Sequence, residues 1–382
     1  MPAYLTIRTR LTLIVAVAAT FSTLALRAGD FSQVAIFVAA AVALAGLAAL
    51  VGDATDQLSH WLGPKATGVL QSGLGNLPEF FIGIFALRAG LLDVVRAALV
   101  GSILANTLLV LGLAFFLGGL RHGPQKFGAD QTRMMATLLV LAAAAIAIPT
   151  IATSPGGPAA GHDVELSVVV SIVLLAVFAA SIPFAVGMGG GGGAAVGGAG
   201  RGGEQTAASK MGAIPATADP AFVERMWPAT LAIAMLLIAG VGAAFVSEWF
   251  VDALQPAMST LGMSQSFAGL VVVAIAGNAV ENVVGVQAML ADNADLAISV
   301  ILNSSLQVAL ALAPVLVLVS LFMGGATLTL VVSPLLAAAL AVTAILAVVV
   351  VIDGESTWLE GVALMGLYVI LGASVWWGPR IA

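Results

Sequence analysis

Long apolar stretches alternate with short polar segments from Leu11 to the C-terminus. Most of these stretches contain about 20 residues, which is the length of a helix that crosses the hydrocarbon core of a bilayer. A membrane β-barrel would instead show short segments in which polar and apolar residues alternate, and the chain has no such pattern. The pattern therefore predicts an all-α polytopic membrane protein.

We expect eleven membrane spans. They lie at about Leu11–Leu26, Val34–Leu50, Ala66–Leu87, Val95–Leu117, Thr132–Thr150, Val164–Val186, Pro228–Val246, Phe267–Met289, Leu296–Leu321, Thr327–Val351 and Trp358–Trp376. The first follows Arg8 and Arg10, so it also resembles a cleaved signal peptide. No convincing small-x-small cleavage site precedes Arg27, which favours a retained, peripheral first helix.

A glycine-rich segment, Gly187–Trp227, separates the sixth span from the seventh. Its composition is typical of a flexible linker, whereas a phosphate-binding loop would need a preceding strand and a Gly-Lys-Ser/Thr ending. The expected units are therefore residues 1–32 with the first helix, 33–187 with five helices, the cytoplasmic linker 188–227, and 228–382 with five more helices.

Lysine and arginine are unequally shared between the two sets of loops. Nine lie on the side of the N-terminus and four on the other, which predicts a cytoplasmic N-terminus. Five spans per unit is an odd number, so the two units enter the membrane from opposite sides. Such an inverted repeat forms substrate sites near the midplane, where the two units meet.

Composition supports the membrane assignment. Of 382 residues, 61% are hydrophobic and 8% charged, whereas soluble domains have roughly 25% charged residues. The net charge of −6 is too thinly spread to indicate a nucleic-acid partner, so the expected partners are the lipid bilayer and small ions. Cysteine is absent, which excludes disulfides and thiolate metal sites, and no cofactor is expected. The oligomeric state stays open, and the expected location is a prokaryotic inner or plasma membrane.

Two glutamates stand alone in apolar surroundings. Glu79 ends the motif Gly75–Glu79, and Glu281 ends the matching motif Gly277–Glu281, 202 residues later. Each is the only charged residue in its run. An ionisable group at the centre of a membrane helix costs about 3 kcal/mol, so each is a candidate functional residue.

The helix that follows each motif is polar on one face. Gly101-Ser102 and Asn106-Thr107 lie in the first unit, and Asn303-Ser304-Ser305 with Gln307 in the second. Carboxylate, amide and hydroxyl oxygens are ligands that suit Ca²⁺ or Na⁺. The alternative is that the amides join helices by hydrogen bonds and that the glutamates are protonated.

Two glutamates would neutralise one Ca²⁺. Without the ion, both carboxylates cannot remain charged cheaply in a low-dielectric site, so we expect them to take up protons. This coupling by itself would exchange protons for a divalent cation.

These motifs resemble the Ca²⁺/cation antiporter superfamily, and most closely its Ca²⁺/H⁺ exchanger branch. The resemblance covers Gly52–Phe127, Leu261–Ser320 and Asp353–Gly361. It implies an eleven-helix exchanger with alternating access, in which Glu79 and Glu281 bind Ca²⁺ and protons in turn. The residues it implies around them are Asn76, Asn278, Ser102, Asn106, Ser304, Ser305 and Gln307.

Three features depart from that branch. Asn282 stands where the branch usually has histidine, and Asn303 stands where it usually has glycine. The linker is rich in glycine where many relatives have an acidic run. The change at Asn282 leaves the coupled ion open, so Na⁺/Ca²⁺ or other divalent-cation exchange is the alternative function.

Several acids lie near the expected inner ends of the helices: Asp53, Asp56, Asp292, Asp295, Asp353, Glu355 and Glu360. They would either gather cations in a vestibule or serve as ordinary loop charges. A passive cation channel is a further alternative. An intramembrane enzyme is not expected, because no aspartate lies inside a predicted span and no His-Glu-x-x-His motif occurs.

Overall fold

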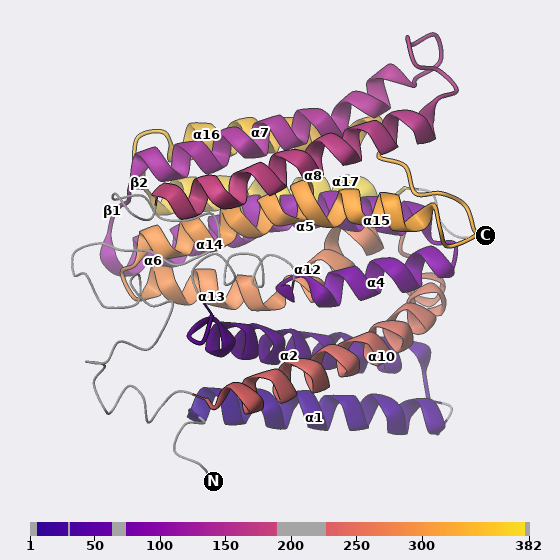
Figure 1. The fold of residues 1–382 in the computed structure, drawn as a ribbon, viewed down its shortest axis with the longest axis vertical. Coiled ribbons are helices and arrows are strands. Elements are labelled where there is room, and N and C mark those ends of the chain that lie inside the picture. The colour runs from indigo at the N-terminus through magenta and orange to yellow at the C-terminus, as the bar shows by residue number, and fades with distance from the viewer. Residues whose placement is uncertain (1–5, 30, 63–73, 189–226, 379–382) are drawn as a thin grey trace.

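The computed structural model describes residues 6–29, 31–62, 74–188 and 227–378 (Figure 1). Before the linker its helices are α1 (Ile7–Ala28), α2 (Gln33–Ser59), α4 (Leu77–Arg88), α5 (Leu92–Leu104), η1 (Ala105–Val110), α6 (Leu111–His122), α7 (Ala129–Ala152) and α8 (Asp163–Met188). After it come α10 (Ala229–Leu261), α11 (Gln265–Phe267), η3 (Ala268–Val273), α12 (Ala274–Gly277), α13 (Ala279–Leu290), α14 (Ala294–Gln307), η4 (Val308–Leu312), α15 (Ala313–Ser320), α16 (Pro334–Val351) and α17 (Trp358–Trp376). Two short strands, β1 (Gln125–Lys126) and β2 (Glu355–Ser356), complete the described elements.

The predicted all-α membrane architecture is confirmed. In the described ranges nine helices are long and apolar enough to cross a membrane, or ten if a bent pair counts as one span. That pair joins Gln265–Gly277 to Glu281–Leu290 through a bend of 63°. The expected span at Ala66–Leu87 lies partly outside the described residues, and its described part is α4.

Some helix ends differ from those expected from hydropathy. The structure extends α2 to Ser59 and α10 to Leu261, so acids beyond the expected span ends, such as Asp56 and Asp252, lie inside helices. The tenth span begins at Pro334 rather than at Thr327. Ser333 caps it, because its side chain accepts a hydrogen bond from the Leu336 amide and Pro334 needs no amide partner.

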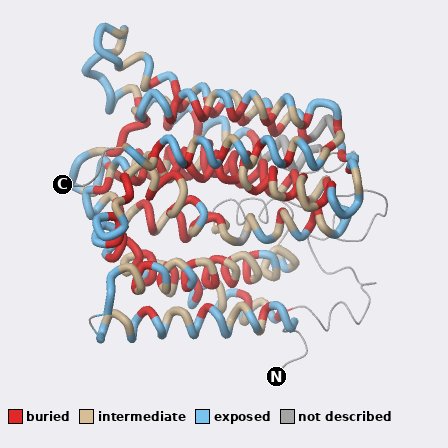
Figure 2. Tube along the Cα trace, turned by 180° about the vertical axis from the view of Figure 1, so that it is seen from behind, coloured by how far each residue is buried: buried red, intermediate tan, exposed pale blue. Residues whose placement is uncertain are grey.

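The α5 and α14 spans form the centre of the bundle. Their helices are largely buried, whereas α1 packs at the edge against α2 and is mostly exposed (Figures 1 and 2). Gly46 permits this contact, since a Cβ there would lie 2.9 Å from Cα of Ala16. Helix α2 packs against α10, and α7 against α16. Each pairing joins a helix of one expected unit to the helix at the corresponding position of the other, and the boundaries of these units stay a prediction.

The two ends of the bundle carry different connections. One end, which we call the ribbon end, holds the antiparallel pair of β1 and β2. This pair joins the segment after α6 to the segment before α17. Lys126 and Glu355 form an ion pair across this ribbon, with 3.1 Å between Nζ and Oε1. The opposite end holds the connection 321–333 between α15 and α16 (Figure 1).

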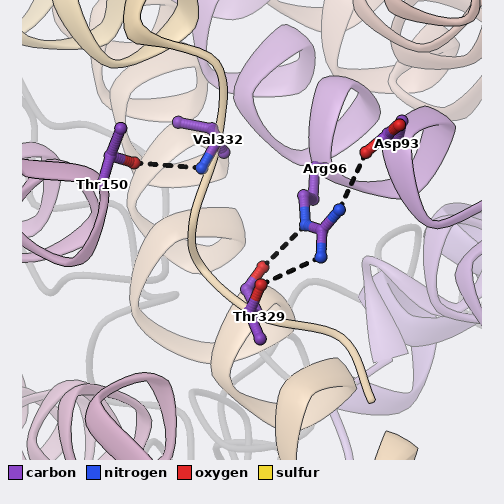
Figure 3. A network of polar contacts seen from close by, with 5 residues as sticks. All are labelled: Asp93, Arg96, Thr150, Thr329 and Val332. Atoms are coloured by element: carbon purple, nitrogen blue, oxygen red, sulfur yellow. Dashed lines mark hydrogen bonds and ion pairs between the residues drawn. The ribbon is translucent and has the colours of Figure 1, made fainter. Parts of the chain in front are cut away.

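The connection 321–333 is tied to several helices. Arg96 of α5 donates from Nε and Nη2 to the carbonyl and hydroxyl oxygens of Thr329, at 3.1 and 2.9 Å (Figure 3). The Val332 amide donates to Thr150 at the end of α7, at 3.0 Å. Arg96 also pairs with Asp93, at 2.8 Å. The loop of one half is thereby fixed to helices of the other.

Candidate functional site

The two repeated motifs lie at helix breaks of the same geometry. Asn76 precedes α4 with φ −99° and ψ 23°, and Asn278 precedes α13 with φ −90° and ψ 21°. Glu79 and Glu281 therefore each lie in the first turn of a helix, where the helix dipole favours negative charge. The sequence repeat is thus also a repeat of backbone conformation.

Two matching π-helical segments lie beside these breaks. They are η1, which contains Asn106 and Thr107, and η4, which begins directly after Gln307. Single π-turns inside α-helices are rare and often occur at functional sites. Here each interrupts the regular pattern of the central helix at the level of its polar side chains.

Asn278 is the centre of a buried hydrogen-bond network. Its Nδ2 donates to Ser102 Oγ and to the Ala274 carbonyl, both at 2.9 Å. Its Oδ1 accepts from Asn106 Nδ2 at 3.1 Å and from Ser304 Oγ at 3.4 Å. Asn106 Nδ2 also reaches Ser304 Oγ, at 2.9 Å. The network joins α5 and η1 of the first half to α12 and α14 of the second.

Asn76 is held more loosely. Its Nδ2 donates to Gln307 Oε1 at 2.9 Å, and its Oδ1 has no hydrogen-bond partner among the described residues. Ser305 faces Thr107, with 3.3 Å between the two hydroxyl oxygens, and does not contact either motif asparagine. The structure thus brings the predicted site residues to one region in three separate sets of hydrogen bonds.

Buried unpaired atoms in this region are all oxygens. In the described part of the chain, neither carboxylate oxygen of Glu79 has a hydrogen-bond partner, and the same holds for Oδ1 of Asn76 and Asn106. Asn282 and Asn303 add two more unpaired amide oxygens. A buried polar atom without a partner costs about 1–3 kcal/mol. Side-chain amides that served only to join helices would therefore form hydrogen bonds with both their nitrogen and their oxygen. A cluster rich in acceptors and poor in donors suits a cation.

Glu79 is buried and closely packed, with 8% of its surface exposed. A Cβ on Gly277 would lie 2.8 Å from Cγ of Glu79, so the second motif supplies the space for the first motif's glutamate. A pocket of about 370 Å³ runs from Glu79 and Ser102 between α4 and α5, and its other lining residues are Ile82, Gly83, Ala86, Val94, Val95, Ala98, Leu99, Val273, Leu312 and Leu316.

Glu281 has a more open position. It is half-buried and is close enough to Glu79 for the two carboxyl groups to interact electrostatically. Two like charges that share a low-dielectric site repel each other, so a divalent cation or protons would relieve the repulsion. The role of this pair in ion exchange stays a prediction from the sequence.

The acids expected in a vestibule have local partners. Asp53 accepts a hydrogen bond from Thr9 of α1 at 3.2 Å, and Asp292 accepts one from Gln125 at 2.9 Å. Asp295 accepts from the Gly128 amide at 2.6 Å. Glu360 caps α17 through Thr357. No group of three or more His, Asp or Glu side chains that could hold a metal occurs in the described ranges, so a second acidic metal site receives no support.

Sequence reasoning did not include Thr107 in the site, although its hydroxyl meets Ser305. It also did not foresee that Arg96 joins the two halves. Polar residues within the apolar span of the first central helix, such as Thr107 and Arg96, could have indicated contacts between the halves. Their partners in the second half can be identified only from the structure.

The sequence profile of the sodium/calcium exchanger protein family matches residues 32–187 and 231–377. The chain is 34% identical to a Ca²⁺/H⁺ antiporter of Synechocystis over 357 residues, which is 92% of this chain and 93% of that protein. It is 32% identical to the Ca²⁺/H⁺ antiporter ChaA of Bacillus subtilis, over 88% of this chain and 90% of that protein.

Two solved structures have the same fold. Native YfkE superimposes with a TM-score of 0.78 at 27% identity, and covers 96% of this chain and 99% of its own. The H⁺/Ca²⁺ exchanger CAX superimposes with a TM-score of 0.69 at 16% identity, over 97% of this chain and 92% of its own.

Proposed function

The chain belongs to the Ca²⁺/cation antiporter family, a family of membrane transporters rather than enzymes, and we propose that it exchanges Ca²⁺ for protons by alternating access. One observation carries the proposal. The Glu79 carboxylate is buried without a hydrogen-bond partner in the described chain, within electrostatic range of Glu281 and beside further unpaired amide oxygens. The similarity to proteins named Ca²⁺/H⁺ antiporters supports the choice of ions.

In the proposed cycle, Ca²⁺ arrives from the cytoplasmic side and displaces protons from Glu79 and Glu281. Asn76, Asn278, Ser102, Asn106, Ser304, Ser305 and Gln307 line the site around the ion. Among them, Asn278 holds its neighbours in place and Asn76 and Asn106 keep unpaired amide oxygens. The units 33–187 and 228–382 then move relative to each other and open the site to the other side. Protons replace Ca²⁺ there and reset the carrier.

The ribbon end of the bundle is the proposed cytoplasmic end, in a bacterial plasma membrane, because the loops richer in lysine and arginine belong to it. If the exchange moves unequal charge, each net charge contributes about 2.3 kcal/mol per 100 mV of membrane potential.

The test is ⁴⁵Ca²⁺ uptake into liposomes that contain the purified protein, driven by either a pH gradient or a Na⁺ gradient. We expect uptake under the pH gradient for the wild type and none for Glu79→Gln or Glu281→Gln. Glu248→Gln is the matched control, since Glu248 lies in a membrane helix, α10, outside the site. Uptake that persists in both site variants would contradict the assigned residues.

Sodium/calcium exchange is the second candidate, because Asn282 stands where the Ca²⁺/H⁺ branch usually has histidine. Uptake driven by Na⁺ alone would favour it, and Asn282→His would then be the first variant to test for recovery of proton coupling. Uptake without any gradient dependence would indicate a channel.

Proton competition gives a second readout. Because Ca²⁺ and protons share the same carboxylates, Ca²⁺ binding to the detergent-purified protein should weaken as the pH falls and the carboxylates become protonated. The glutamine variants should lose this dependence.

A further inference from the structure

Tyr368 of α17 makes a buried hydrogen bond to a π-helical segment of the second half. Its side chain is 4% exposed, and its hydroxyl donates to the carbonyl oxygen of Leu270 in η3, at 3.2 Å. A hydroxyl buried among apolar side chains costs free energy unless it has a partner. The bond therefore ties η3 to α17 at one defined residue.

The carbonyl that Tyr368 reaches is one that the π-helical pattern bypasses. In a regular α-helix the Ala274 amide would donate to the carbonyl four residues earlier, which is that of Leu270. In η3 the Ala274 amide is instead bonded to the carbonyls of Gly269 and Val271. The Tyr368 hydroxyl thus takes the place of a backbone donor, and its bond favours the π-helical form of η3 over the α-helical one.

Leu270 is held from a second side by α5. A Cβ on Gly101 would lie 2.5 Å from both Cα and the carbonyl oxygen of Leu270, so the two backbones are in direct contact. Further along α17, Trp376 packs edge-on against Phe267, with 4.6 Å between the ring centroids. The segment that contains η3 is therefore fixed between α5 and α17.

This segment leads directly into the second motif. Leu270, Ala274 and Asn278 follow one another at intervals of about one helical turn. The Ala274 carbonyl accepts from the backbone amide and from Nδ2 of Asn278, at 3.1 and 2.9 Å. Replacing a π-turn by regular α-helix shifts the hydrogen-bond register by one residue, which turns the following residues by about 100°. The register of η3 thus determines where Asn278 and Glu281 point.

We infer that Tyr368 is a positioning residue of the ion site, because its hydroxyl holds η3 in the register that presents Asn278 and Glu281 to the ion. The inference rests on the proposed function. Without this bond η3 populates other registers, and Ca²⁺ binding has to restore the productive one. The apparent affinity then falls in proportion to the fraction of molecules in the productive register.

The test uses Tyr368→Phe, which removes the hydroxyl and keeps the ring. Equilibrium ⁴⁵Ca²⁺ binding to the full-length protein in detergent should give a dissociation constant about fivefold higher, the effect of losing one neutral hydrogen bond. In liposomes, uptake under a pH gradient should show a raised KM and little change in the maximum rate. Amide hydrogen exchange, followed by mass spectrometry, should become faster in residues 268–278.

Ser320→Ala is the matched control. The Ser320 hydroxyl is also buried, and it donates to the Val317 carbonyl at 2.7 Å and accepts from the Leu328 amide at 2.9 Å, outside the site. This variant should lower the thermal midpoint at least as much as Tyr368→Phe does. It should leave the dissociation constant for Ca²⁺ and the exchange of residues 268–278 unchanged, because a loss of stability alone does not alter the register of η3.

Unchanged Ca²⁺ affinity in folded Tyr368→Phe protein, or an equal loss of affinity in Ser320→Ala, would overturn the inference. The wild type supplies a measurement that needs no variant: without Ca²⁺, the amides of residues 268–278 should already exchange slowly, and fast exchange there would also overturn it. Failure of the proposed function is a separate result, since it requires gradient-driven uptake to survive Glu79→Gln and Glu281→Gln.

Discussion

The two halves of the site repeat the same motif but hold it differently. In the first half, Glu79 is buried and packed against Gly277, and Gly101 leaves no space beside the central helix. In the second half, Glu281 is half-buried and Asn303 occupies the position that matches Gly101. The first half thus supplies a fixed carboxylate, and the second supplies a more open one.

The asparagines show the reverse asymmetry. Asn278 of the second half is fully hydrogen-bonded, whereas Asn76 of the first half makes one hydrogen bond. Each half therefore contributes one closely held group, Glu79 or Asn278, and one that is held less closely. Packing fixes the position of Glu79, but both of its carboxylate oxygens remain unpaired in the described chain.

The largest effect should come from exchanging the residues that distinguish the halves. Gly101→Asn places a side chain 2.5 Å from the Leu270 backbone and should cost about 3 kcal/mol or more, because the backbone cannot move aside easily. The reciprocal Asn303→Gly should cost only about 1 kcal/mol, the usual penalty for glycine in a helix. Thermal unfolding in detergent, followed by size-exclusion chromatography, checks both. Equal losses of stability in the two variants would contradict the proposed difference between the two halves.

Removing the space beside Glu79 should have the largest effect on transport rather than on stability. Gly277→Ala brings a methyl group to 2.8 Å from Glu79 Cγ and should displace the carboxylate, lowering Ca²⁺ uptake about tenfold. Gly366→Ala in α17 is the control, because a Cβ there meets no atom within 4 Å. Liposome uptake rates under a pH gradient give the comparison, and normal uptake by Gly277→Ala would show that the packing of Glu79 is not critical.

The asparagines should differ in their effect on stability. Asn278→Ala leaves Ser102 without its partner in a buried network, removes one of the two hydrogen bonds of Asn106 and should cost about 2–3 kcal/mol, whereas Asn76→Ala should cost about 1 kcal/mol. The shift of the thermal midpoint measures this difference. A larger shift for Asn76→Ala would mean that the hydrogen bonds are not what makes the two positions unequal.

The smallest effects should come from the contacts at the two ends of the bundle. Arg96→Ala removes the bonds to Thr329, and Asp295→Ala removes the bond from Gly128. Each should lower stability by about 1 kcal/mol and leave the KM for Ca²⁺ unchanged, because neither residue belongs to the site. Initial rates of uptake over a range of Ca²⁺ concentrations test this, and a raised KM would connect these contacts to ion binding.

Much of the architecture was predictable because a membrane makes polarity costly. Apolar stretches of sufficient length become helices, and the all-α membrane fold was predicted correctly on this basis. The same cost makes Glu79 and Glu281 conspicuous in the sequence. The ends of α2, α10 and α16 were less predictable, because caps and packing, rather than hydropathy, decide where a helix stops.

By itself, the sequence determined the membrane class, the repeated motif and the kinds of oxygen ligand that gather after it. The assignment of individual residues to the ion site stays a prediction. Only the tertiary structure decided that Glu79 packs on Gly277, that Asn278 is fully bonded and that Asn282 and Asn303 keep free oxygens. The reason is physical: whether a buried polar atom is paired depends on which helix faces it, and that partner can be as far away in the chain as Gln307 is from Asn76, 231 residues.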